Sequence, residues 1–105
     1  MKRVHITIPK DELEEFCRRW QITRFALFGS ALREDFGPKS DVDVLVTFAQ
    51  DANWSLLDAV RMEDELTKLF GRKVDLVTRW AVEHSKNWIR REAILASAEV
   101  IYEQG

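Results

Sequence analysis

Hydrophobic residues form the apolar stripe of a helix in two stretches of the chain, and a third stretch is also predicted to be helical. In residues 10–22 they are spaced at i, i+3, i+4 and i+7, the apolar stripe of an amphipathic helix formed by Leu13, Phe16, Cys17 and Trp20. A second helix is predicted over residues 55–70, because Ser55 and Asp58 form a capping-box pattern and Gly71 is a typical residue just beyond a helix end. A last helix is predicted over about residues 86–97.

Shorter apolar runs between these helices are typical of β-strands, and they cover residues 25–28, 41–48 and 73–78. The sequence "EVIYE" predicts a short extended segment near the C-terminus. Between the first two strands, Gly37-Pro38 indicates a turn, and "SALRED" is long enough for one or two helical turns. The order α-β-(short α)-β-α-β-α predicts an α/β (α+β) fold with a small mixed sheet flanked by helices, in one domain over residues 1–105.

Composition and charge narrow the class of protein. The chain is 46% hydrophobic and 32% charged, which is typical of a globular protein. Its net charge of -2 and the absence of a long basic run argue against direct nucleic-acid binding. A single cysteine, Cys17, permits no internal disulfide, and no apolar run resembles a signal peptide or a membrane span. We therefore expect a cytoplasmic protein that does not enter a membrane.

Two of the predicted strands contain aspartates. Because strand side chains alternate, Asp41 and Asp43 are expected on one face, about 6 to 7 Å apart, while Val42, Val44 and Val46 fill the other face. Adjacent carboxylates repel, and a hard divalent cation such as Mg²⁺ would compensate them. Asp75, in the apolar run "KVDLV", completes a three-carboxylate cluster if its strand lies beside the second strand.

The alternative is that these aspartates simply face solvent, as most aspartates do. Gly29-Ser30 favours the functional interpretation. Glycine lets the backbone approach a phosphate closely, and the following amides with the Ser30 hydroxyl would form a small anion-binding nest. A phosphate cradle beside a metal pair indicates a nucleotide site.

These residues also carry a family resemblance. Gly29-Ser30, ten further residues and Asp41-Val42-Asp43 resemble the GS-x10-DxD signature of the DNA polymerase β-type nucleotidyltransferase superfamily. Within it, nearly the whole chain is similar to the MNT-domain minimal nucleotidyltransferase antitoxins. The similar segments are "IPKDELEEFCRRWQITRFALFGSALREDFGPKSDVDVLVTF", the second helix, "GRKVDLVTRWAV" and the tail "IRREAILASAEVIYE". The resemblance implies a polymerase β-like nucleotidyltransferase fold.

The resemblance also implies a role for each motif residue. Four positions would bind the nucleotide: Gly29, Ser30, Arg33 and Ser40. Three would be catalytic and bind Mg²⁺, with the last also helping to deprotonate the attacking hydroxyl: Asp41, Asp43 and Asp75. Many family members have "RAR" where this chain has "ALR", so one basic residue of the phosphate loop is missing here.

The activity implied is Mg²⁺-dependent transfer of AMP from ATP to a protein hydroxyl. The expected acceptor is a tyrosine of a HEPN-domain ribonuclease toxin, which the chain would bind in a hetero-oligomer as the antitoxin of a type VII toxin-antitoxin pair. A different class of function is neutralisation by stoichiometric binding with little catalysis. Transfer to a small molecule is a third possibility, although it calls for a larger chain or a dimer to build the acceptor pocket.

Several aromatic and polar residues outside the motif are expected to have structural rather than catalytic roles. Trp54, Trp80 and Trp88 are expected to be core or interface anchors rather than base-stacking residues. His84 has no partner motif and is expected at the surface. Glu63 lies beside the apolar stripe of the second helix, where a solvated boundary residue is favoured over a fourth acid or an arginine partner.

Overall fold

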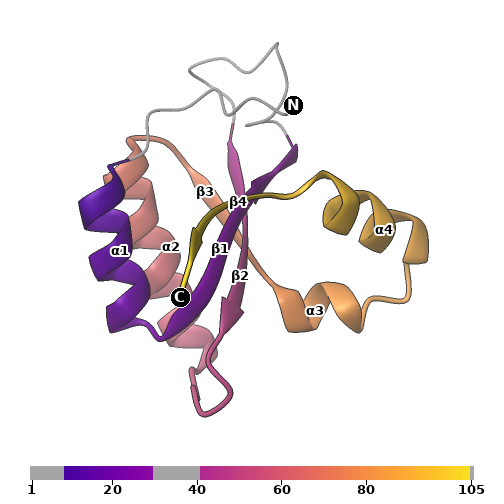
Figure 1. Cartoon of the computed structure of the whole chain (residues 1–105), viewed down its shortest axis with the longest axis horizontal. Coiled ribbons are helices and arrows are strands. Elements are labelled where there is room, and N and C mark those ends of the chain that lie inside the picture. The colour runs from indigo at the N-terminus through magenta and orange to yellow at the C-terminus, as the bar shows by residue number, and fades with distance from the viewer. Residues whose placement is uncertain (1–8, 30–40, 105) are drawn as a thin grey trace.

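The computed structural model describes residues 9–29 and 41–104, which form a mixed four-stranded sheet with helices on both faces (Figure 1). The strand order is β3-β2-β1-β4. β1 (Ile22–Phe28) pairs antiparallel with β2 (Val42–Phe48) and with β4 (Glu99–Glu103), whereas β3 (Val74–Thr78) is parallel to β2. The predicted mixed sheet and the predicted closing strand are both confirmed.

The helices divide into two layers (Figure 1). α1 (Lys10–Arg19) and α2 (Leu56–Phe70) cover one face of the sheet, and α3 (Arg79–Glu83) and α4 (Trp88–Ser97) cover the other. Across the described ranges, none of these helices has the length and apolar character needed to cross a membrane.

Each face of the sheet has its own hydrophobic core, and the alternation of side chains along β1 separates them. Phe25 and Leu27 pack with residues of α1 and α2, while Ala26 and Phe28 pack with Val82 of α3 and with α4. All four residues of this run are buried. The continuous apolar run 25–28 is therefore a strand covered on both faces, as predicted.

Local signals place α2 where the sequence predicts it. Ser55 and Asp58 form a reciprocal capping box, and Gly71 ends the helix in the left-handed conformation with φ of 73°. The first helix, in contrast, is shorter than the predicted 10–22. Gln21 adopts a φ of 56° and turns the chain into β1, which begins at Ile22 rather than at residue 25.

The second half of the chain holds a short helix that the hydrophobic pattern does not predict. α3 is only five residues long, too short to show a period, and it begins where the Thr78 hydroxyl accepts a hydrogen bond from the Ala81 amide. α4 starts at Trp88 instead of about residue 86, because the Asn87 side chain caps it by accepting from the Arg90 amide.

Cys17 lies on the buried face of α1 and is fully enclosed in the core. Its burial makes the stability of the protein depend on pH. Burial, with a smaller contribution from the Glu14 carboxylate, raises the pKa of the thiol from 9.0 to about 12. The folded state therefore keeps the thiol proton where the unfolded chain loses it, so stability is retained below pH 9 and falls as the pH rises towards 12.

We expect the free energy of unfolding to fall by up to about 1.4 kcal/mol per pH unit in this window because of Cys17. Urea unfolding of the wild type and of Cys17→Ala at several pH values measures the effect. The variant will be less stable at every pH, and the difference between the two proteins should shrink as the pH rises. A constant difference would contradict the assignment.

Candidate active site

Two aspartates lie side by side on neighbouring strands. In the parallel pairing of β2 and β3, Asp43 is the register partner of Asp75. Adjacent strands are about 4.8 Å apart, and register partners point to the same face of a sheet. The sequence predicts that Asp75 lies near Asp43 only if their two strands are neighbours. In the structure β3 does lie beside β2.

The face that carries the acids is the one covered by α3 and α4. Val42 and Val44 are buried with α1 and α2, so the alternating Asp43 and Leu45 face the other way, and Leu45 belongs to the core under α3 and α4. β3 repeats this pattern, because Asp75 is followed two residues later by Val77, which packs on the same core. On the sheet face covered by α3 and α4, both strands therefore carry an aspartate followed two residues later by a hydrophobic core residue.

Gly29 lies against one of the two acids. It follows β1, whose last residue Phe28 is the register partner of Asp43. Its φ of +69° is in the left-handed region, and a Cβ atom added there would be 2.5 Å from Oδ2 of Asp43. Only glycine fits both the backbone conformation and the space beside the carboxylate. The glycine of the predicted phosphate cradle is thus packed against a predicted metal ligand.

Of the remaining predicted site residues, the structure describes only Asp41. Asp41 is half-buried and directly precedes β2, two residues before Asp43, and the next amide, that of Val42, donates to the carbonyl of Lys73 at 2.9 Å. The predicted turn, the "SALRED" segment and three predicted nucleotide-binding residues lie outside the described residues; those three are Ser30, Arg33 and Ser40. Their roles stay predictions.

The donor chemistry of the acids suits a hard cation. Asp43 and Asp75 offer carboxylate oxygens from adjacent strands, and Mg²⁺ usually binds one or two protein carboxylates and completes its coordination with phosphate oxygens and water. In residues 9–29 and 41–104, no group of three or more His, Cys, Asp or Glu side chains is arranged to hold a metal ion. The two-carboxylate pairing fits Mg²⁺, and the three-carboxylate site stays a prediction.

Glu63 differs from the favoured expectation of a solvated boundary residue. It is half-buried on α2, and its Oε2 accepts a hydrogen bond from the backbone N–H of Leu76 at 2.8 Å. Leu76 follows Asp75 directly, so this glutamate contacts the strand segment that carries an acid of the site. Its place beside the apolar stripe of α2 is the only sequence signal, and that signal does not reveal the backbone partner.

The aromatic residues fall into a packed group and an exposed group. Trp54 is half-buried, donates from Nε1 to the Trp20 carbonyl at 2.8 Å and meets the Trp20 ring edge-on at 5.0 Å. Trp80 and Trp88 are 68% and 63% exposed, so neither is a core anchor. His84 is at the surface, as expected.

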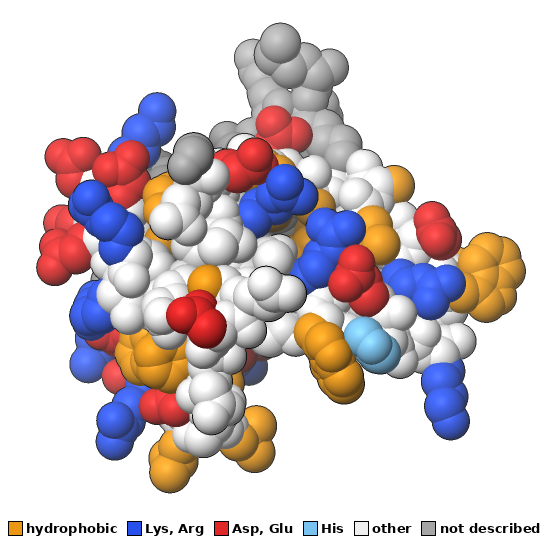
Figure 2. All heavy atoms as spheres, turned by 60° about the horizontal axis from the view of Figure 1, so that its bottom comes forward, with side chains coloured by type: hydrophobic (Ala, Val, Ile, Leu, Met, Phe, Trp, Pro, Cys, Tyr) orange, Lys and Arg blue, Asp and Glu red, His pale blue; other side chains and the backbone are white. Residues whose placement is uncertain are grey.

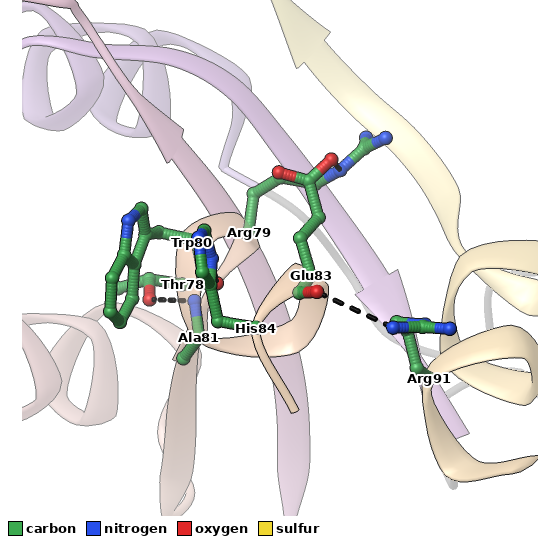
Figure 3. A network of polar contacts seen from close by, with 7 residues as sticks. All are labelled: Thr78, Arg79, Trp80, Ala81, Glu83, His84 and Arg91. Carbon is green, nitrogen blue, oxygen red and sulfur yellow. Dashed lines mark hydrogen bonds and ion pairs between the residues drawn. The ribbon is translucent and has the colours of Figure 1, made fainter. Parts of the chain in front are cut away.

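Figure 3 shows that Trp80 belongs to a local network around α3. Its ring stacks on the His84 ring at 4.1 Å, and the Trp80 carbonyl contacts His84 Nδ1 at 2.8 Å. Arg79 and Glu83 form an ion pair on the same helix. This network follows the C-terminal end of β3, whereas Asp75 lies near its N-terminal end, so it is separate from the acidic pair.

The charged side chains of the described residues form no single-sign field on the face shown in Figure 2. Lysines and arginines there are interspersed with acidic residues and with separate hydrophobic patches. This distribution agrees with the low net charge of the sequence.

Comparison with known proteins places this geometry in a family. Residues 10–99 match the nucleotidyltransferase domain family. The protein adenylyltransferase MntA of Thermococcus cleftensis is 38% identical over 74 residues, which is 70% of each chain. A candidate protein adenylyltransferase of Methanocaldococcus jannaschii is 36% identical over 66 residues, covering 63% of this chain and 65% of that protein. The match thus spans slightly less than two thirds of the latter.

Solved structures show the same fold. A candidate minimal nucleotidyltransferase is 30% identical, with a TM-score of 0.64 over 86% of both chains. A tri-AMPylated Shewanella oneidensis HEPN toxin in complex with its MNT antitoxin gives a TM-score of 0.59 over 90% of this chain and 70% of that chain, at 14% identity. The chain, with Gly29 packed against Asp43 and Asp43 paired with Asp75, belongs to the nucleotidyltransferase domain family.

Proposed function

We propose that this protein transfers AMP from ATP to a tyrosine hydroxyl of a HEPN-domain toxin and thereby acts as its antitoxin. The observation that carries the proposal is the pairing of Asp43 with Asp75 beside Gly29. Support comes from the relative named protein adenylyltransferase MntA and from the fold shared with the antitoxin bound to an AMPylated HEPN toxin. The cytoplasm remains the predicted compartment.

The proposed reaction is a displacement at phosphorus. The acceptor oxygen bonds to the α-phosphorus of ATP, the bond from that phosphorus to the bridging oxygen of the β-phosphate breaks, and pyrophosphate leaves. The hydroxyl proton passes to Asp75. Asp41, Asp43 and Asp75 would hold Mg²⁺, which supplies positive charge to the phosphate oxygens as negative charge develops there.

The other predicted residues bind and orient the nucleotide. Gly29 and Ser30 would hold the triphosphate through backbone amides and a hydroxyl, and Arg33 and Ser40 would contact phosphate oxygens. Catalysis then consists mainly of positioning and charge stabilisation, which are the main contributions to this class of transfer.

Incubation with ATP labelled in the α-phosphate, Mg²⁺ and the proposed HEPN-domain partner tests the proposal. We expect label on a tyrosine of the partner, located by mass spectrometry, together with loss of its ribonuclease activity. ATP labelled in the γ-phosphate is the control and should leave the partner unlabelled. If the partner is neutralised without label from either nucleotide, the chain acts by stoichiometric binding instead.

A further inference from the structure

β3 is the edge strand that carries Asp75. In the order β3-β2-β1-β4 of the described strands it has a strand neighbour on one side only, and it is just five residues long. Within residues 9–29 and 41–104, no strand pairs with the backbone groups on its outer side, and short edge strands fray readily. The position of Asp75 therefore depends on how firmly β3 is held against β2.

The charges of the site oppose this pairing. Asp43 and Asp75 are register partners, and like charges placed directly opposite each other on adjacent strands destabilise the pairing. A contact that holds β3 in place is accordingly most useful next to Asp75.

Glu63 supplies a contact at that place. Its Oε2 accepts from the outward-pointing N–H of Leu76 at 2.8 Å, and Leu76 is the residue directly after Asp75. The carboxylate is half-buried and comes from α2, where the neighbouring Met62 and Leu66 are buried in the core. Hydrogen bonds to a charged acceptor are about twice as strong as neutral ones. The edge of β3 is thus fastened to a helix that is itself anchored.

We propose that Glu63 is a positioning residue, which holds β3 through the Leu76 amide and so keeps Asp75 beside Asp43. The inference rests on the proposed function for its catalytic consequence. Glu63 acts through the backbone, because its Oε2 accepts a hydrogen bond from the Leu76 amide beside Asp75.

The test compares Glu63→Met with Glu63→Gln. Methionine keeps the length and the helix propensity of glutamate but removes the strong acceptor, whereas glutamine keeps an acceptor oxygen. Asp64→Asn is the matched control, because Asp64 is an exposed acid on the same helix whose partner is Lys68. All variants are measured below their melting temperatures, after circular dichroism has shown that they are folded.

We expect Glu63→Met to lower kcat for AMP transfer by about 10–100-fold, the usual effect of losing a partner that orients metal ligands. The KM for ATP should change little, Glu63→Gln should recover part of the activity, and Asp64→Asn should match the wild type. Two readouts do not depend on activity: the affinity for Mn²⁺ measured by electron paramagnetic resonance, and hydrogen exchange of the Leu76 amide. Glu63→Met should weaken the first and accelerate the second.

Either of two results would overturn the inference. One is a folded Glu63→Met with unchanged Mn²⁺ affinity and an unchanged Leu76 exchange rate. The other is Glu63→Gln as impaired as Glu63→Met, which would mean that charge rather than the hydrogen bond matters. If Glu63→Met does not fold, rapid Leu76 exchange in the wild type would itself refute the contact. A wild type that binds Mn²⁺ and protects Leu76 but transfers no AMP would refute the proposed function alone.

Discussion

Replacing Asp43 with asparagine should reduce the proposed AMP transfer to a HEPN partner by on the order of 10³-fold, which is the scale of losing a charge-stabilising group in an active site. Asp43 is the central acid of the arrangement, because it is the register partner of Asp75 and also the contact of Gly29. Asparagine keeps the size of the side chain but carries no charge to hold Mg²⁺. Labelled AMP on the partner, measured at saturating ATP, gives the loss directly.

The control for Asp43→Asn is Asp51→Asn, which removes a charge from an exposed turn and should leave transfer unchanged. Co-purification with the partner should survive both substitutions, since neither changes the hydrophobic core. If Asp43→Asn transfers AMP at the wild-type rate, the assignment of this acid is wrong. If it transfers none but still neutralises the partner fully, binding alone accounts for the antitoxin effect.

Gly29→Ala should lower AMP transfer by about 100-fold, because displacing a reacting group by about 1 Å costs on that order. The new methyl group would be 2.5 Å from Oδ2 of Asp43. The carboxylate group at the end of the Asp43 side chain is the part most free to move. The carboxylate is therefore pushed away from its position beside Asp75. Single-turnover rates at saturating ATP and Mg²⁺ measure the effect.

Gly71→Ala is a matched control for Gly29→Ala. Gly71 has a φ of +73°, close to the +69° of Gly29, but an added Cβ would meet nothing within 4 Å. Both substitutions should lower the free energy of unfolding by about 1–2 kcal/mol for the left-handed backbone. Only Gly29→Ala should impair transfer. Equal activities for the two variants would show that the contact between Gly29 and Asp43 has no catalytic importance.

The elements that the sequence predicts well are those with local signals. The capping box at Ser55 and the glycine at position 71 fix both ends of α2, and the alternation in "DVDVLV" assigns each side chain of β2 to a face. The sequence could predict that Asp43 and Asp75 lie close together only if their strands are neighbours. Strand order itself depends on contacts between segments far apart in the sequence.

The features that the sequence could not predict depend mainly on backbone geometry. The left-handed Gln21 shortens α1, although nothing in its residue type demands that conformation. α3 is too short to show a hydrophobic period. Glu63 looks like a boundary residue because its partner is a backbone amide, which leaves no trace in a pattern of side chains.

The alternation of acids and valines in β2 has a consequence for strand register. A slip of one residue would turn Asp43 towards the core under α1 and α2 and turn Val42 and Val44 towards the face that carries the acids. Burial of an unpaired carboxylate costs several kcal/mol, so a slip of one residue is strongly disfavoured. The carboxylates assigned to catalysis thus also identify the correct alignment of the sheet, and the sequence that forms the site helps to select the fold that contains it.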